Sequence, residues 1–369
     1  MDTAVFLNIS KIIERESKTT TYKFALLRGV IDIIGENSPY ITMQDGKAHF
    51  PLGLLIEKWL IYYYPFFEVD IPIPQINGGS RLAFQKELQV ITHYYKNRGG
   101  LSVFYNDLRT GGFSKEIITP FLGLIKKLRD TITRMPMKHL GTSVNNQYYS
   151  IFSYQSQKAR TTATLNLEWL ITSFGSFSIP LAYFEAFRIL GSFVSGTDSI
   201  LFKWADFSVT ASGNELTVAR VLHEALKNPV TERDVLAAQR LYRSVLQQSG
   251  VVTCVWTGAA LTRYDIDHVI PFSIWKNNDL WNLLPATPIV NNRKRNKIPS
   301  SLFLEQRKDH IIRYWETLKR FQEERFLAEL RVALLGKQDI GNWQNQAFEQ
   351  LKNTSDYLIQ TRGYESWEL

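Results

Sequence analysis

One segment in the last third of the chain concentrates side chains that could carry out acid–base and metal chemistry. Asp267 and His268 stand side by side, and two asparagines follow at Asn282 and Asn291. An imidazole exchanges protons near neutral pH, and carboxylate and amide oxygens are the ligands that hard cations prefer. A basic run without an acidic residue closes the segment: Arg293, Lys294, Arg295 and Lys297. These residue types make the segment the candidate site of the protein.

The residues around these side chains predict a strand, a loop, a second strand and a short helix. Residues 264–270 alternate as a strand does, and a proline ends the run. Residues 283–284 can begin a second short strand. Thr287 followed by Pro288 is typical of a helix N-cap and a first helical residue, which places Asn291 one turn into a helix. The predicted order of elements is therefore ββα.

This pattern resembles the HNH nuclease family, whose ββα-metal fold binds one divalent cation. The resemblance covers residues 254–300 and rests on an Asp-His pair before a proline, a central asparagine, and a helical asparagine with a lysine three residues later. It comes close to the HNH domains of RNA-guided CRISPR nucleases, which share the Asp-x-Asp-His-x-x-Pro and final Pro-Ser elements. Some family members have a second histidine where this chain has Asn291.

The resemblance implies a role for each residue. His268 would be the general base that deprotonates the attacking water, and Asn282 would orient it or brace the loop. Asp267 and Asn291 would hold one Mg²⁺ or Mn²⁺ ion through oxygen atoms. Lys294 would contact a phosphate. Adjacent residues on a regular strand face opposite ways, so Asp267 and His268 can meet at one phosphate only if the strand is irregular there.

Simpler interpretations stand beside these roles. Asn282 can be an ordinary turn residue, and Asn292 competes with Asn291 for the helical position. Asp265 is expected to be structural. A run of cations is usually a solvated surface, but its place beside a phosphodiester site favours contact with nucleic acid for all four basic residues.

The first 249 residues are predicted to form a mainly helical region. Apolar residues recur at helical spacing along 22–35, 83–98 and 119–132. Aromatic and β-branched residues at 148–154 and 163–171 predict a β-hairpin. Its polar loop carries Lys158 and Arg160, two weaker candidates for contact with nucleic acid.

These patterns predict an α+β, mostly helical fold in three parts. Residues 1–249 form the mainly helical N-terminal region, with the β-hairpin near 145–172. Residues 250–300 form the HNH ββα-metal nuclease module, and residues 301–369 form helices that pack on it. The N-terminal region is far larger than a fifty-residue module needs for folding. It is therefore expected to recognise a target or regulate the activity, with scaffolding or dimerisation as the alternative.

Composition narrows the class of protein. The chain has 369 residues, a net charge of +8, 44% hydrophobic and 21% charged residues, proportions typical of a folded protein. The basic balance suits a polyanionic partner without requiring one. A single cysteine, Cys254, excludes an internal disulfide framework and Cys-rich zinc knuckles. The N-terminal residues lack a signal-peptide pattern, and the most apolar run, 51–65, is too short to span a bilayer. A cytoplasmic protein is expected.

The sequence therefore predicts a metal-dependent HNH endonuclease that hydrolyses phosphodiester bonds in DNA, as a restriction or phage-defence nuclease does. One alternative is a catalytically silent protein that binds nucleic acid or regulates a partner. Another is a nuclease that prefers RNA. The expected partners are DNA, or RNA under that alternative, together with a second copy of the chain or a partner defence protein.

Overall fold

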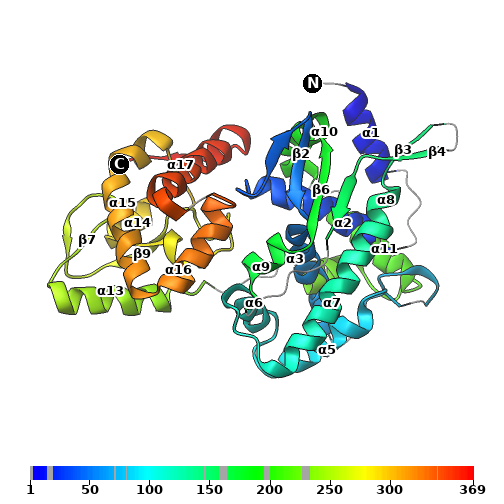
Figure 1. Ribbon diagram of the computed structural model, residues 1–369, viewed down its shortest axis with the longest axis horizontal. Helices are drawn as coiled ribbons and strands as arrows, with labels where there is room; N and C mark the ends of the chain where they lie inside the picture. Colours follow the sequence, from blue (N-terminus) through cyan, green and yellow to red (C-terminus); the bar gives the residue numbers. More distant parts are fainter. Residues whose placement is uncertain are drawn as a thin grey trace. The chain divides into compact units, whose positions relative to one another are not determined.

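The chain forms two compact units (Figure 1). Unit 1 comprises Met1–Glu36 and Tyr40–Val230, and unit 2 comprises Asn37–Pro39 and Thr231–Leu369. The computed structural model describes residues 3–14, 20–69, 72–79, 81–144, 147–157, 164–194, 200–226, 233–338 and 340–369. The fold is mostly helical with small sheets.

Unit 1 is a helical body around one small sheet. Its helices are α1 (Thr3–Glu14), α2 (Tyr22–Gly35), α3 (Leu52–Tyr63), α4 (Pro65–Glu68), α5 (Gln85–Tyr95), α6 (Gly100–Thr110), α7 (Lys115–Arg134), α8 (Pro136–His139), α9 (Leu167–Thr172), α10 (Leu181–Val194), α11 (Ile200–Ala211) and α12 (Val218–Val221). Its strands are β1 (Thr42–Gln44), β2 (Lys47–Pro51), β3 (Gly141–Val144), β4 (Gln147–Ser150), β5 (Ser153–Ser156) and β6 (Gly175–Pro180). The sheet has the order β1-β2-β6-β5 with antiparallel neighbours, and β3 pairs separately with β4.

Helices α2 and α3 form the centre of unit 1. Both are buried on nearly all sides and mostly apolar, as central helices are, and they pack against each other. The approach is close at Gly29, where an added Cβ would lie 2.5 Å from Leu55 Cδ1. The apolar run 51–65 thus contains a buried helix. Lys58 within it is buried with its ammonium 2.6 Å from Glu36 Oε1, because an unpaired buried charge would be costly.

Two predictions for unit 1 were wrong in detail. Residues 167–172 form helix α9, so they do not supply the second arm of a hairpin with 148–154. The strand that pairs with β4 is β3, and β5 pairs with β6 in the larger sheet. Short aromatic and β-branched runs fit either a strand or a buried helix, and tertiary packing decided between them. Helix α7 begins at Lys115, one turn before the predicted start, with Pro120 inside it. Lys158 and Arg160 lie outside the described residues.

Unit 2 contains the candidate site. Its helices are α13 (Leu236–Ser249), α14 (Pro288–Lys294), α15 (Ser301–Phe321), α16 (Glu323–Leu330) and α17 (Trp343–Asp356). Its strands are β7 (Val252–Thr253), β8 (Ala260–Leu261), β9 (Asp265–His268), β10 (Leu283–Ala286), β11 (Ile298–Pro299) and β12 (Ser366–Trp367). Its helices and strands share one apolar core, in which Trp256, Trp281 and Trp315 are fully buried.

Hydrogen bonds join the segment 250–300 to the helices on both sides of it in the sequence. Tyr242 of α13 donates its hydroxyl to the Leu283 carbonyl at 2.9 Å, inside the core. Trp315 of α15 donates to the Trp281 carbonyl at 2.8 Å. Glu329 of α16 accepts from the Leu280 amide at 2.7 Å. Helix α13 therefore packs in unit 2, whereas the sequence division at 249/250 had placed it in the N-terminal region.

Among the described residues, no helix combines the length and the hydropathy that crossing a bilayer requires.

Candidate functional site

Strand β9 and helix α14 carry most of the residues singled out from the sequence, and Asn282 directly precedes strand β10. The two strands pair antiparallel, with His268 opposite Leu283 and Asp267 opposite Leu284. Helix α14 follows β10 directly. The hydroxyl of Thr287 accepts from the Val290 amide at 3.2 Å, which caps the helix as the Thr-Pro pair predicts.

Asp267 lies in the interior of unit 2 with both carboxylate oxygens bonded. The Trp256 indole N–H donates to Oδ2 at 2.7 Å, and the Lys294 ammonium lies 3.1 Å from Oδ1. The residue is only 4% exposed. Burial raises the pKa of Asp267, and the charge and hydrogen bond of Lys294 oppose that rise. The carboxylate is therefore held in one orientation by two donors.

The sequence predicted that Lys294 contacts a phosphate, but the structure places this residue in the interior. Its side chain is fully buried, and its ammonium also donates to the His268 carbonyl at 2.5 Å. The ammonium lies over the Trp256 ring, 5.9 Å from its centroid. Burial lowers the pKa of Lys294, and the negative charge of Asp267 opposes that shift. Lys294 thus joins α14 to two consecutive residues of β9 and does not face solvent.

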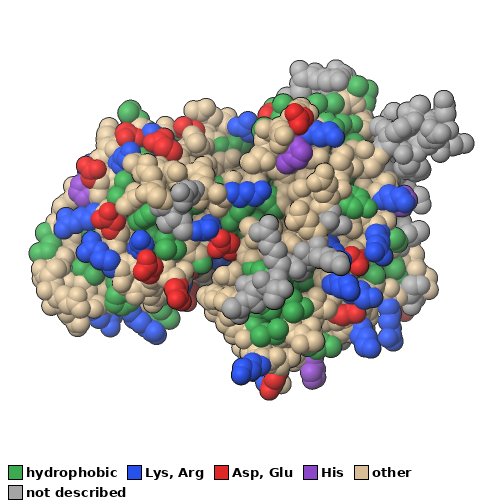
Figure 2. Space-filling model, in the orientation of Figure 1, with side chains coloured by type: hydrophobic (Ala, Val, Ile, Leu, Met, Phe, Trp, Pro, Cys, Tyr) green, Lys and Arg blue, Asp and Glu red, His purple; other side chains and the backbone are tan. Residues whose placement is uncertain are grey.

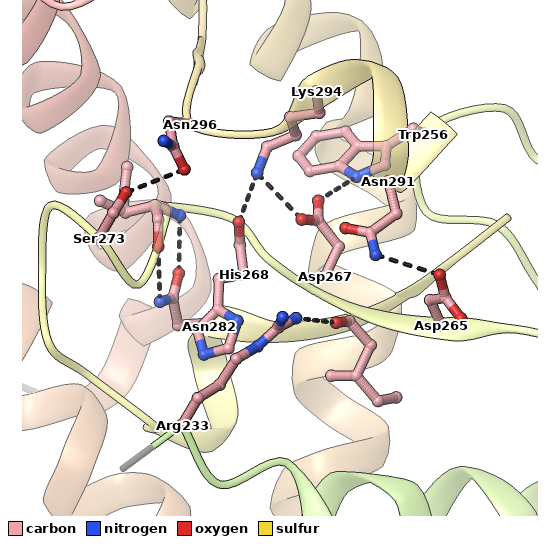
Figure 3. Close-up of polar contacts among 12 residues, drawn as sticks. Arg233, Trp256, Asp265, Asp267, His268, Ser273, Asn282, Asn291, Lys294 and Asn296 are labelled. Atoms are coloured by element: carbon pink, nitrogen blue, oxygen red, sulfur yellow. Dashed lines mark hydrogen bonds and ion pairs between the residues drawn. The ribbon is translucent and has the colours of Figure 1, made fainter. Parts of the chain in front are cut away.

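Asn291 and Asp265 extend this polar cluster along β9. The Asn291 amide nitrogen donates to Asp265 Oδ2 at 3.2 Å. With the nitrogen held there, the amide oxygen of Asn291 is turned toward Asp267 (Figure 3). Asp265 and Asp267 are two residues apart on a strand and so share one face. The neighbouring Asn292 is exposed, so Asn291 is the asparagine that faces the cluster.

His268 leaves β9 in another direction. Its ring points away from the Asp267 carboxylate, toward the side where Arg233 lies (Figure 3). Its Nε2 is 3.4 Å from Asn278 Oδ1, and its ring packs 5.5 Å from that of Phe272. Burial lowers the pKa of His268 to about 4, with the Arg233 charge adding to the shift. The ring is neutral at pH 7, and the regular strand keeps it apart from Asp267.

Asn282 closes the loop between the two strands. Its Oδ1 accepts from the Ile270 amide at 2.8 Å, and its Nδ2 donates to the Ile270 carbonyl at 3.0 Å. Its own carbonyl accepts from the Val269 amide at 2.9 Å. The side chain is fully buried and directed at backbone, not at the His268 ring. Of the two roles expected for it, the structure shows the contacts of a loop brace.

The remaining basic residues are on the surface. Arg293 and Arg295 are exposed, and Lys297 is partly exposed and paired with Glu365. Arg295 ends α14 with a φ of 50°, and its Nε donates to the Asn292 carbonyl at 3.3 Å. Two guanidinium groups are thus directed outward from the end of the helix that carries Asn291.

Three further residues contact the site although the sequence motif did not indicate them. Trp256 bonds Asp267, Asn278 contacts His268, and the guanidinium of Arg233 donates to the Ile266 carbonyl at 3.1 Å. Arg233 precedes the motif by more than thirty residues, so no local spacing connects it with His268. Only the packing of the segment before α13 against β9 brings it there.

Two families match the chain. A domain of unknown function (DUF8808) matches residues 2–226, more than half of the chain. The chain belongs to this DUF8808 family. The HNH endonuclease family matches residues 256–300, which confirms the resemblance predicted for this segment. No curated protein matches the chain. The nuclease match thus lies in unit 2, and the family of unknown function covers almost all of unit 1.

The donor set of the site suits a hard cation. Among the described residues, no group of three or more His, Cys, Asp or Glu side chains is close enough to hold a metal. A carboxylate from Asp267 and amide oxygen from Asn291 nevertheless make a pair of oxygen donors on one side of β9 (Figure 3). Oxygen donors are what Mg²⁺ and Mn²⁺ prefer. The residues therefore fit such an ion chemically, with Lys294 competing for one carboxylate oxygen.

Proposed function

We propose that this protein is a metal-dependent endonuclease that hydrolyses phosphodiester bonds in DNA, as restriction and phage-defence nucleases do. In this proposal β9, β10 and α14 form the ββα-metal module of the HNH family. The observation that carries it is the Asp267–Asn291 pair. Two separate elements bring a carboxylate and an amide oxygen together, and Asp265 fixes which end of the amide faces the carboxylate.

In the proposed reaction each residue of the site has a separate task. Asp267 and Asn291 would hold one Mg²⁺ or Mn²⁺ ion. Such an ion would stabilise the negative charge that develops on the phosphate and the leaving oxygen. His268 would take a proton from the attacking water, and because its ring and the Asp267 carboxylate leave β9 in different directions, the proposal requires β9 to distort at this pair when the phosphate is bound. The Asn278 amide oxygen lies 3.4 Å from Nε2 of His268, which favours the tautomer with its hydrogen on Nε2, and in this proposal Nδ1 would take up the proton.

Asn282 and Lys294 would act through these groups, as positioning residues. Asn282 fixes the chain directly after His268 through the two bonds to Ile270. Lys294 fixes the Asp267 carboxylate and the His268 carbonyl together. Catalytic groups work only when their supporting contacts hold them in place, so the loop and the helix end are part of the proposed site.

A protein that binds nucleic acid without cleaving it is a second candidate. It is favoured by one observation: both oxygens of Asp267 already have donors, and one of these is a cation. A carboxylate neutralised by Lys294 has less need of a metal ion. Under this alternative the Asp-His-Asn set would hold the module together without supporting hydrolysis.

The two candidates separate in one assay. Supercoiled plasmid is incubated with the full-length protein in Mg²⁺ or Mn²⁺, with and without a chelator. The nuclease proposal predicts nicked or linear products that the chelator abolishes. Intact plasmid in both metals, together with retardation of the plasmid on a gel, would favour the silent binding protein. A matched RNA substrate tests the choice of nucleic acid.

The exposed arginines after Asn291 give a prediction about binding. Replacing Arg293 and Arg295 with alanine is expected to flatten the salt dependence of DNA affinity, by about one unit of log–log slope for each lost phosphate contact. Fluorescence anisotropy with a labelled duplex in chelator measures this without cleavage. Lys297→Ala is the control, because Glu365 already pairs with that lysine. An unchanged slope in the double variant would mean that both arginines are solvated surface.

A further inference from the structure

Nearly all of the net charge of the chain comes from one part of unit 1. Residues 81–138 contain 11 Lys and Arg against 4 Asp and Glu, a net charge of +7 where the whole chain has +8. This stretch includes α5, α6, α7 and α8. Figure 2 shows several Lys and Arg side chains over the part of the molecule where Figure 1 labels α7 and α8. A local excess of this size is typical of a surface that meets a polyanion.

A surface pocket of about 370 Å³ lies between α5 and α7 within this stretch. Its basic lining residues, His93, Lys96 and Arg98, are all exposed. Glu116 is its acidic lining residue. The pocket therefore presents cations around an opening wide enough for a phosphate group.

The basic surface continues beyond the pocket along both helices. Positions three or four apart share one side of a helix, so Lys86 stands on the side of α5 that carries Val90 and His93. In the same way, Lys127 stands on the side of α7 that carries Pro120 and Gly123. Both lysines are exposed, and nothing lies within 4 Å of a Cβ added at Gly123. The surface of α7 is therefore open at Gly123.

This surface, the α5–α7 basic strip, consists of Lys86, His93, Lys96, Arg98 and Lys127. Helix α5 and its end from Lys86 to Asn97 span about 16 Å at 1.5 Å per residue. One strand of B-form DNA carries about five phosphates over that length of its axis. The strip therefore matches a short stretch of one DNA backbone.

The aromatic ring of the pocket favours duplex over single-stranded DNA. Single-strand sites stack bases on open aromatic faces. The Arg98 guanidinium covers the Tyr94 ring, 4.0 Å from its centroid, and the Tyr94 hydroxyl bonds Ser114 Oγ at 2.7 Å. With one face of this ring covered by a cation, the strip offers mainly charge for phosphates.

We propose that the α5–α7 basic strip of the DUF8808 unit binds the phosphodiester backbone of duplex DNA. The choice of DNA as the polyanion rests on the proposed function. The strip itself is inferred from the local net charge, the surface pocket and the exposure of its side chains. Backbone contacts position a protein without reading sequence. In this proposal unit 1 holds the duplex that the module in unit 2 would cut.

The test measures binding in the absence of cleavage. Full-length protein is titrated into a labelled 20-base-pair duplex in chelator, at several salt concentrations. Replacing Lys86, Arg98 and Lys127 together with glutamine is expected to lower the log–log salt slope by about 2.7, close to 0.9 for each lost contact. Glu116→Gln is expected to tighten binding, because it removes the acidic lining residue of the pocket.

A charge-matched control distinguishes binding at this strip from a general effect of the positive charge of unit 1. Lys47, Arg188 and Lys203, replaced together with glutamine, remove the same charge from parts of unit 1 outside residues 81–138. The proposal is overturned if this control lowers the slope as much as the strip variant, or if the strip variant keeps the wild-type slope. Because chelator prevents cleavage throughout, a protein that fails to cut plasmid can still confirm the strip. A protein that cuts plasmid can equally refute it.

Discussion

Replacing His268 with alanine is expected to lower the rate of plasmid cleavage by about 10²–10⁴-fold, the usual cost of losing a general base. The imidazole is buried at the end of β9 and held by contacts with Asn278 and Phe272. Alanine removes the proton acceptor but leaves the strand pairing, because His268 pairs with Leu283 through its backbone. Initial rates of nicking at saturating Mn²⁺ measure the effect.

A second histidine of the same unit provides the control. His310 lies on α15, beside Gly258, and has no place in the proposed mechanism, so His310→Ala is expected to cleave at the wild-type rate. Circular dichroism and the melting temperature establish that both variants fold. A folded His268→Ala protein that cleaves as fast as the wild type would remove His268 from the mechanism.

Replacing Lys294 with methionine is expected to destabilise the module by about 3–5 kcal/mol. Methionine keeps most of the length of the side chain and removes the cation. Asp267 would then remain buried with a negative charge and only the Trp256 N–H as a donor. Hydrogen exchange of peptides from residues 256–300 measures the opening free energy of this segment, independently of the stability of unit 1.

Two further variants make the prediction about Lys294 specific. Lys297→Met removes a cation whose pair with Glu365 is on the surface, and such pairs contribute about 0–1 kcal/mol. Adding Asp267→Asn to Lys294→Met is expected to restore much of the loss, because a neutral amide needs no counter-charge. A loss below about 1 kcal/mol for Lys294→Met alone would show that the buried pair does not stabilise the module.

The sequence predicted strand β9 and the start of helix α14 because the signals for both are local. Alternation predicted β9, the Thr287-Pro288 pair predicted the start of α14, and the HNH resemblance selected Asp267, His268 and Asn291. Each signal depends on residues within a few positions of one another. The structure has a strand, a capped helix and an inward-facing Asn291 at these positions.

The helical spacing between Asn291 and Lys294 already indicates in the sequence that Lys294 is buried, although its charge suggests an exposed residue. Asn291 and Lys294 are three residues apart on a helix and so share one side of it. If Asn291 faces the strand, Lys294 faces it too, whereas Arg293 and Arg295 point elsewhere. Treating all the basic residues as one cluster ignored this periodicity.

Other parts of the site depend on long-range packing, which no local pattern reports. Arg233 and Trp256 reach the site from outside the strand–helix segment. The orientation of His268 depends on whether β9 is regular, and its pairing with β10 decides that. The true pairing of β5 with β6 joins strands separated by helix α9.

The dependence of cleavage on Mn²⁺ concentration tests the central claim, that Asp267 and Asn291 hold the catalytic metal. Cleavage rates are measured across a Mn²⁺ titration for the wild type and for Asn291→Ala, with Asn292→Ala as the exposed neighbouring control. Losing even an outer partner of a metal ligand typically costs about 10–100-fold in metal affinity or activity. The account predicts that Asn291→Ala needs at least about tenfold more Mn²⁺ for half-maximal rate or loses cleavage altogether, while Asn292→Ala follows the wild-type curve. Superimposable curves for Asn291→Ala and the wild type would contradict it.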